Sequence, residues 1–193
     1  TTSNQLFGTL LGQANELLKS VVEAEKAETK AEVSEIDDLL SDVAAAQDSI
    51  TGVVNPIYDY VKGAGYAGGP VLIQVDIKDQ PTVDSYLNRT DVRTLLPADM
   101  RYTKFLWGIP DEKTNLVDLY VIKANRTNEP PLSGSVIVDA AQTYDQLGGA
   151  AVSMQMNGKG ARIWEEMTGK AYTEKSNIAI VLDDVVYSAP GVS

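Results

Sequence analysis

The chain has 193 residues, 44% of them hydrophobic, which is enough to bury a core in one or two domains. Its formal net charge is −11, from 27 acidic and 16 basic residues, and this charge repels phosphate backbones and anionic lipid headgroups. The chain has no Cys and no His, which removes thiolate and imidazole metal sites, His-assisted nucleophiles and haem ligation. The composition argues against nucleic-acid binding and leaves carboxylate, Lys, Tyr or oxygen-ligated metal chemistry.

No stretch approaches the roughly 18 consecutive apolar residues that a membrane-spanning helix needs. No signal peptide opens the chain. Because the first residue is Thr rather than Met, we expect an excised piece of a larger protein. The lack of Cys is compatible with both a reducing compartment and the cell envelope, so it leaves the location open.

Two helices are predicted within the first 48 residues. The first runs from residue 3 to about 30, where apolar residues recur three and four positions apart; they are Phe7, Leu10, Leu11, Ala14, Leu17, Leu18, Val21 and Val22. The second covers residues 32–48 and follows the capping-box pattern "TKAE". We expect an antiparallel helical pair, with a coiled-coil partner site as the alternative.

A glycine pattern follows a predicted short helix at residues 56–62. Gly63, Gly65 and Gly68 match the spacing of the dinucleotide fingerprint, which requires a strand before the glycines and a helix after them. Here the order is reversed, because the strand "PVLIQVDI" comes after them. The glycines therefore indicate a flexible connector, and no cofactor is predicted.

Residues 56–124 are expected to form a small α+β unit. Helices are predicted at residues 79–89, with Asp79 as the cap, and at residues 91–96. Strands are predicted at residues 101–107 and 117–123, with Pro110 through Asn115 as their hairpin loop. The first of these strands carries Tyr102, Phe105 and Trp107, which either line an apolar groove or belong to the core.

The polar, proline-containing stretch at residues 125–134 marks a crossing between lobes. Beyond it, the pattern predicts strands at residues 135–145 and 150–156, and then a helix from Asn157 to about Lys170. The predicted buried side of that helix is Ala161, Ile163, Trp164 and Met167. These elements predict a ferredoxin-like, open-faced antiparallel sheet with one long helix.

Two pairs of adjacent carboxylates are the obvious candidates for catalysis. They are Glu165 with Glu166 and Asp183 with Asp184. Neighbours in a helix point about 100° apart, and neighbours in a turn are solvated, so neither pair converges on one substrate bond. No calcium loop, Walker lysine, serine elbow or HExxH motif is present. No catalytic, cofactor-binding or metal-binding residue is therefore predicted.

The last third of the chain carries a series of landmarks in a fixed order. They are Leu132-Ser133-Gly134, Asp139-Ala140, Gly149, Gly160-Ala161-Arg162, Thr168, Ile180-Val181-Leu182-Asp183 and Ser188-Ala189-Pro190. With these landmarks the chain resembles the first periplasmic domain of SecD, an accessory subunit of the bacterial Sec protein-export machinery. The stretch at residues 83–108 looks like the long form in fused SecDF proteins of Bacteroidetes-type bacteria.

The resemblance implies a division into two parts. Residues 1–130 would be the head insert, made of the helical pair at 3–48 and the α+β unit at 56–124, and residues 131–193 would be part of the base. The upstream base strands of the family and its Asp-Leu-Arg-Gly-Gly segment are missing here, which implies an incomplete base. The family places Asp and then Gly or Asn at a hairpin turn, so Asp183 and Asp184 are expected to shape a turn.

The function implied by the resemblance is not enzymatic. Such proteins assist proton-gradient-driven preprotein translocation at the periplasmic face of the inner membrane, with the SecYEG channel and SecF as partners. The head would contact unfolded preprotein, and Tyr102, Phe105 and Trp107 are the residues that we expect to make this contact. The alternatives are a carboxylate-dependent hydrolase of the cell envelope and an adhesion or assembly module that uses the helical pair.

Overall fold

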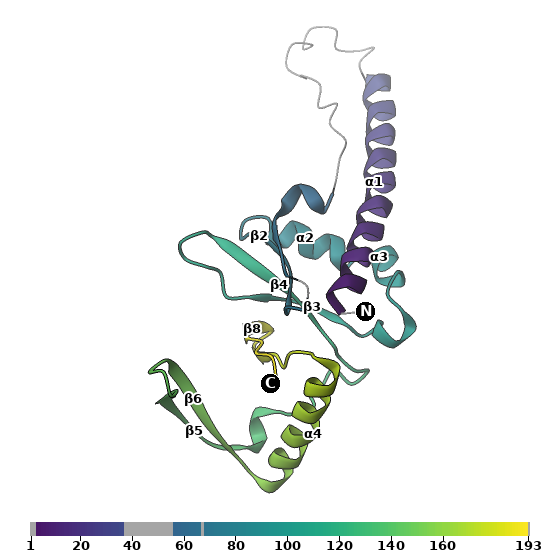
Figure 1. Ribbon diagram of the computed structural model, residues 1–193. Coiled ribbons are helices and arrows are strands. Elements are labelled where there is room, and N and C mark those ends of the chain that lie inside the picture. Colours follow the sequence, from purple (N-terminus) through teal and green to yellow (C-terminus); the bar gives the residue numbers. More distant parts are fainter. Residues whose placement is uncertain (1–2, 37–55, 67, 193) are drawn as a thin grey trace.

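The computed structural model describes residues 3–36, 56–66 and 68–192, which form a mixed α/β structure with helices and a mixed sheet (Figure 1). The helices are α1 (Ser3–Ile36), α2 (Gln80–Leu87), α3 (Thr90–Thr94) and α4 (Gly158–Glu174). The strands are β1 (Val61–Ala64), β2 (Val71–Asp76), β3 (Lys104–Gly108), β4 (Leu116–Ile122), β5 (Ile137–Tyr144), β6 (Ala150–Met156), β7 (Ile180–Leu182) and β8 (Val185–Ser188). Both kinds of element were predicted, so the mixed class is confirmed.

The main sheet has the strand order β1-β2-β4-β3-β8-β7, and its pairs are antiparallel except for β3 and β8. In that parallel pair, Trp107 lies opposite Val185 and Gly108 lies opposite Val186. β5 and β6 form a separate two-stranded antiparallel sheet. Figure 1 shows α1, α2 and α3 around the upper part of the molecule, and the β5–β6 hairpin and α4 in the lower part.

The hydrophobic core lies between α1 and the helix-facing side of the main sheet. Helix α1 contributes Phe7, Leu11, Ala14 and Leu18, whose spacing of three and four residues places them on one face. Alternate residues of the central strands, such as Val75, Val117 and Leu119, face this helix and are buried. The predicted apolar face of the first helix is therefore confirmed, and it packs within its own domain.

The predicted end of the first helix near residue 30 is wrong. Helix α1 continues to Ile36, and the "TKAE" pattern lies inside it rather than at the start of a new helix. Residues 23–36 contain no Gly or Pro and are rich in Ala, Glu and Lys, which have high helix propensity, so nothing local ends the helix. The remainder of the predicted second helix, residues 37–48, lies outside the described residues, and the helical pair is not confirmed.

The predicted helix at residues 56–62 is also mostly wrong. Only Tyr58–Tyr60 form a short 3₁₀ turn, and Val61 begins β1, which pairs with β2. Gly65 lies where the two strands come closest: a Cβ at this position would overlap the carbonyl oxygen of Val71. The glycine-rich segment therefore belongs to a β-hairpin, and the predicted flexible connector is wrong because Gly63 lies in β1 and the Gly65 N–H bonds to the carbonyl oxygen of Leu72 in β2.

In the lower part, the boundaries of β6 and the cap of α4 agree with the sequence pattern. The Asn157 side chain accepts a hydrogen bond of 2.9 Å from the backbone N–H of Gly160. The predicted buried face of α4 is only partly right, because Ala161 is exposed and Ile163, Trp164 and Met167 are half-buried. Gly160 and Ala171 are the buried residues of this helix instead.

The ferredoxin-like sheet is not confirmed. β7 and β8 join the main sheet through β3, whereas β5 and β6 pair only with each other, so the predicted strands do not form one open-faced sheet. The cause is non-local, because β8 pairs with a strand about 80 residues earlier in the chain. Alternation within a strand indicates which face is buried but does not name the partner strand.

The turn between β7 and β8 has the geometry that the two aspartates predict. Asp183 and Asp184 have φ angles of 50° and 60°, the left-handed values of a type I′ hairpin. The Lys104 Nζ lies 3.2 Å from the Asp184 Oδ1 and joins this turn to the start of β3. The aspartates therefore shape a hairpin, as the resemblance implies.

Replacing Asp184 by Gly should raise the free energy of unfolding by about 0.5–1 kcal/mol, because Gly adopts a positive φ without steric cost. The exposed ion pair with Lys104 would be lost, which subtracts a few tenths of a kcal/mol. Urea denaturation would measure the change, and Lys104→Gln would measure the loss of the ion pair alone. A stability below that of Lys104→Gln would contradict the turn assignment.

Candidate functional site

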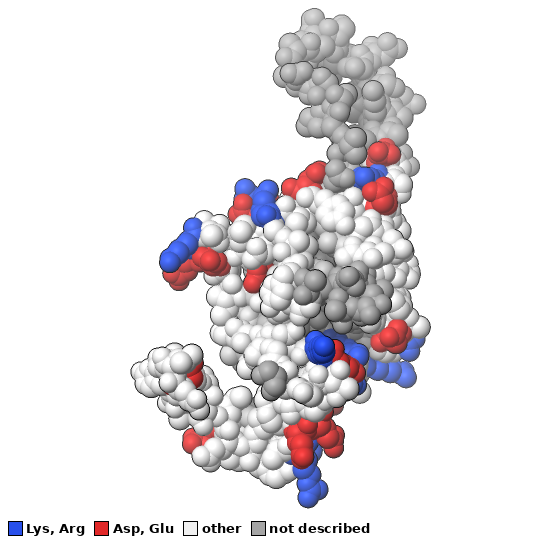
Figure 2. All heavy atoms as spheres, viewed as in Figure 1, with Lys and Arg blue, Asp and Glu red and all other residues white. Residues whose placement is uncertain are grey.

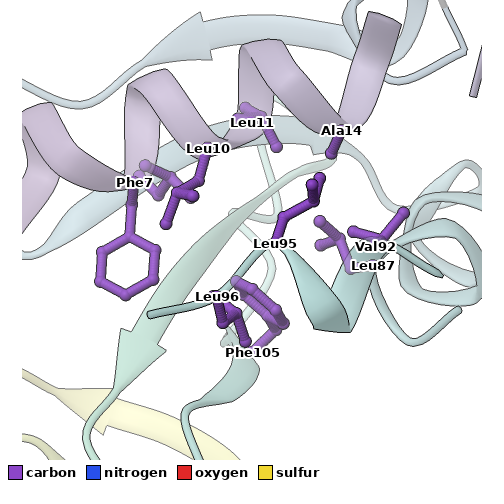
Figure 3. Close-up of a pocket in the computed structure, with 10 residues that line it drawn as sticks. Phe7, Leu10, Leu11, Ala14, Leu87, Val92, Leu95, Leu96 and Phe105 are labelled. Carbon is purple, nitrogen blue, oxygen red and sulfur yellow. The ribbon is translucent and has the colours of Figure 1, made fainter. Parts of the chain in front are cut away.

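An apolar pocket opens between α1, the α2–α3 region and strand β3 (Figure 3). Its buried floor is formed by Phe7, Leu11, Ala14, Leu72, Leu87 and Val92, and its half-buried rim by Leu10, Leu95, Leu96 and Phe105. In Figure 3 the side chains of α1 face those of Leu87, Val92 and Leu95 across the pocket. The lining is entirely apolar, as expected for a site that receives apolar groups.

The pocket is nearly closed in this conformation. The space inside it is only about 20 Å³. The pocket therefore accepts one small apolar group as it stands, and a larger side chain once the rim residues move.

Phe105 lies on the rim of this pocket, and its ring is covered by a cation. The guanidinium carbon of Arg93 lies 5.5 Å from the ring centroid, within the range of a cation–π contact. Arg93 Nη2 also donates to the backbone carbonyl oxygens of Thr103, at 2.7 Å, and Arg101, at 3.2 Å. Partial burial lowers the pKa of Arg93 from its usual value, yet the guanidinium stays charged. Arg93 thus fixes the chain that leads into β3.

Trp107 lies two residues further along β3 and faces the same side of the sheet as Phe105. It is only 8% exposed, and its indole Nε1–H donates to the Asp84 Oδ1 of α2 at 3.4 Å. Trp107 does not line the pocket. The structure therefore places this residue in the core, which is the second of the two roles that the sequence left open.

Tyr102 precedes β3 and is half-buried. The guanidinium carbon of Arg101 lies 4.8 Å from its ring centroid. Of the three residues predicted to contact preprotein, Phe105 lines the pocket, Tyr102 lies three residues before it, and Trp107 supports the strand from the core. The contact itself stays a prediction.

The α1 side of the pocket could not be assigned to a site from the sequence. Phe7, Leu10 and Leu11 follow the spacing of an ordinary core-facing helix, and nothing in that pattern indicates an opening. Leu95 and Leu96 are a weak indication of the site in the sequence. They are adjacent leucines at the end of a short helix, just before Pro97, and two adjacent side chains cannot both lie on one face of that helix.

The β5–β6 hairpin exposes a second apolar surface. Tyr144 and Val152 lie on one face of it and are 68% and 70% exposed. Figure 2 shows this hairpin, at the lower left, as nearly free of charged groups. No bordering charge specifies a ligand for this face, so the pocket is the better defined candidate site.

The two carboxylate pairs lie outside the pocket. Glu165, Glu166, Asp183 and Asp184 are all exposed, and none lines the pocket. Among the residues that the structure describes, no group of three His, Cys, Asp or Glu side chains could hold a metal ion. In the same part of the chain, no helix is long and apolar enough to cross a membrane.

The chain is similar to a described protein family and to individual known proteins. Residues 114–193 match the family described as SecDF, P1 head subdomain. The chain is 36% identical to the protein translocase subunit SecD of Rhodothermus marinus over 141 residues, which are 72% of this chain. It is 37% identical to the protein translocase subunit SecDF of Thermus thermophilus over 70 residues, which are 36% of this chain. The family match and both relatives support a SecD/SecDF domain.

The aligned part of the chain spans 21% of the length of the Rhodothermus relative and 9% of the Thermus relative. No solved structure matches the chain. The Rhodothermus match is consistent with the Bacteroidetes-type resemblance. The relatives carry the names of translocase subunits, which are components of protein transport.

The family description gives the name head to residues 114–193. The predicted division used this name for residues 1–130 and assigned residues 131–193 to a partial base. The family description and the predicted division thus apply the name head to different residues. The boundary near residue 130 stays a prediction.

Proposed function

We propose that the chain is a periplasmic domain of a Sec accessory protein and that its apolar pocket contacts unfolded preprotein emerging from the SecYEG channel. The parent protein would lie in the inner membrane, work with SecF, and use the proton gradient through groups outside this chain. The domain itself would have no enzymatic activity. The match to the SecDF P1 head subdomain supports the assignment to the Sec machinery. The apolar pocket supports the proposed contact with unfolded preprotein.

The observation that carries the proposal is the half-buried rim of Leu10, Leu95, Leu96 and Phe105 around an apolar floor. An unfolded polypeptide exposes the apolar side chains that a folded protein buries, so a site for single apolar groups distinguishes the two states. A nearly closed pocket that must open for each side chain would bind weakly and release quickly, as transport requires.

The first test is a titration of the purified chain with an unfolded secretory precursor and with its folded mature form, at moderate salt. Tryptophan fluorescence would report binding, because Trp107 neighbours the Phe105 strand segment and would sense movement of the rim. We expect weak, saturable binding of the unfolded precursor only. Binding of neither form, or equal binding of both, would contradict the proposal.

A matched pair of substitutions locates the site. Leu96→Ser should weaken binding of the unfolded precursor about five- to tenfold, because it removes an apolar contact worth about 1–1.4 kcal/mol. Leu147→Ser is the control, because Leu147 lies at the tip of the β5–β6 hairpin and is 96% exposed. Circular dichroism would verify that both variants are folded. If Leu147→Ser weakened binding more than Leu96→Ser, the contact would lie on the hairpin instead.

A further inference from the structure

We propose that the pocket selects apolar segments by the charge that flanks them, with segments that carry neighbouring carboxylates favoured over segments that carry Lys or Arg. This inference rests on the proposed function, because it names the class of polypeptide that the pocket would take. It depends on two arginines beside the pocket, which differ in their surroundings from the other cations of this region.

The first of these cations is Arg93. Its guanidinium covers the Phe105 ring on the pocket rim and donates to two backbone carbonyl oxygens, but it makes no ion pair with a carboxylate among the described residues. Backbone carbonyls and an aromatic face hold the guanidinium in place without neutralising its charge. The full positive charge therefore remains at the edge of an apolar pocket.

The second cation is Arg101. Its backbone carbonyl oxygen accepts from Arg93 Nη2 at 3.2 Å, so the main chain at Arg101 lies against the guanidinium that covers the Phe105 ring. Its side chain is exposed and lies against the Tyr102 ring, and within the described part of the chain it also has no ion-pair partner. A ligand carboxylate could reach this guanidinium without displacing an internal contact.

The nearby cations differ from these two because they are paired. Arg89 lies 3.0 Å from Asp91, and Lys104 lies 3.2 Å from Asp184. Asp99, two residues before Arg101, and Asp84, which accepts from the Trp107 indole, are acidic side chains of this region for which no such pair is formed. Two arginines without an ion-pair partner among the described residues therefore lie along the segment from α3 to β3, in a chain whose net charge is −11.

The overall charge and the local charge predict opposite preferences, which makes the proposal easy to test. A net charge of −11 attracts basic peptides over the whole surface. The two arginines attract acidic groups within a Debye length of about 10 Å at 0.1 M salt. A preference for acidic flanks can therefore come only from a local cationic site.

The experiment uses three synthetic peptides with the same apolar centre and with Asp, Ser or Lys residues on both sides. Their dissociation constants for the intact 193-residue chain would be measured by fluorescence at 0.1 M and 1 M salt. At the lower salt concentration we expect the Asp-flanked peptide to bind about two- to fivefold more tightly than the Ser-flanked one, the range of an exposed ion pair. The Lys-flanked peptide should bind most weakly. At 1 M salt the three affinities should converge.

Variants at the exposed arginine locate the selectivity. Arg101→Gln should reduce the advantage of the Asp-flanked peptide, whereas Arg101→Lys, which keeps the charge, should retain most of it. Arg126→Gln is the control, because this substitution removes the same charge from an exposed residue in the segment between β4 and β5. Arg93 is left intact in these variants because its backbone hydrogen bonds hold the rim.

The possible outcomes distinguish a failure of charge selection from a failure of the proposed function. Equal affinity for the three peptides, or tighter binding of the Lys-flanked peptide, would overturn charge selection and leave apolar binding standing. Failure of all three peptides to bind would contradict the proposed function at this pocket. An equal effect of Arg101→Gln and Arg126→Gln would show that total charge, rather than the rim, sets the preference.

Discussion

Replacing Asn15 by Ala should lower the free energy of unfolding by about 2–3 kcal/mol. Asn15 is 1% exposed, and its Oδ1 accepts hydrogen bonds from the backbone N–H groups of Ile57, at 3.1 Å, and Tyr58, at 3.4 Å. The N–H of Ile57 is buried, so the substitution would leave a buried donor without its acceptor. The measurement is urea denaturation followed by far-ultraviolet circular dichroism.

The control for this substitution is Gln13→Ala. Gln13 carries the same amide group on the same helix, but it is exposed, so we expect a change within about 0.5 kcal/mol. Both substitutions raise helix propensity, so similar losses from the two would mean that the buried hydrogen bonds of Asn15 do not determine the effect. Asn15 joins α1 to a segment 42 residues later, and its loss should also loosen α1 against the sheet.

Replacing Trp107 by Ala should cost about 3–5 kcal/mol, the usual range for removing a large buried aromatic side chain. Trp107 is almost fully buried and is tied to Asp84 by its indole N–H. A loss of precursor binding in this variant would therefore reflect unfolding as much as a missing contact. Thermal and urea denaturation would measure the loss of stability.

Trp107→Phe is a milder change at the same position. It keeps an aromatic ring in the core but removes the indole donor and some buried volume, so a loss of about 1–2 kcal/mol is expected. If Trp107→Ala were as stable as the unsubstituted chain and lost only precursor binding, Trp107 would be a contact residue, and its assignment to the core would be wrong. Phe105 and Leu96 are better positions for testing contact, because both lie on the half-buried rim.

Elements with strong local signals could be predicted from the sequence. The strand at residues 150–156, the Asn157 cap and the turn at Asp183 and Asp184 are determined by alternation, a capping side chain and turn geometry, which act over a few residues. Strand β1 was missed because it is short, contains Gly63 and exists through its pairing with β2. Local propensity contains little information on such a strand.

Only the part of the candidate site that depends on local alternation could be predicted from the sequence. Alternation along β3 placed Phe105 and Trp107 on one face of the sheet. It could not show that Phe105 lies on the pocket rim and that Trp107 lies in the core. That difference is decided by α1 and α2, which cover the same face of the sheet at different points. The contacts are tertiary, and no local pattern in either segment records them.

The parallel pairing of β3 with β8 has a consequence for the order in which the chain folds. Strands β1 to β4 and the helices that cover them are complete by Ile122, whereas β8 begins only at Val185. During synthesis, β3 would remain an open edge strand until β8 emerges, and an open edge can pair with another nascent chain. Slow synthesis of residues 123–184 should therefore favour aggregation, and early supply of a separate β7–β8 peptide should suppress it.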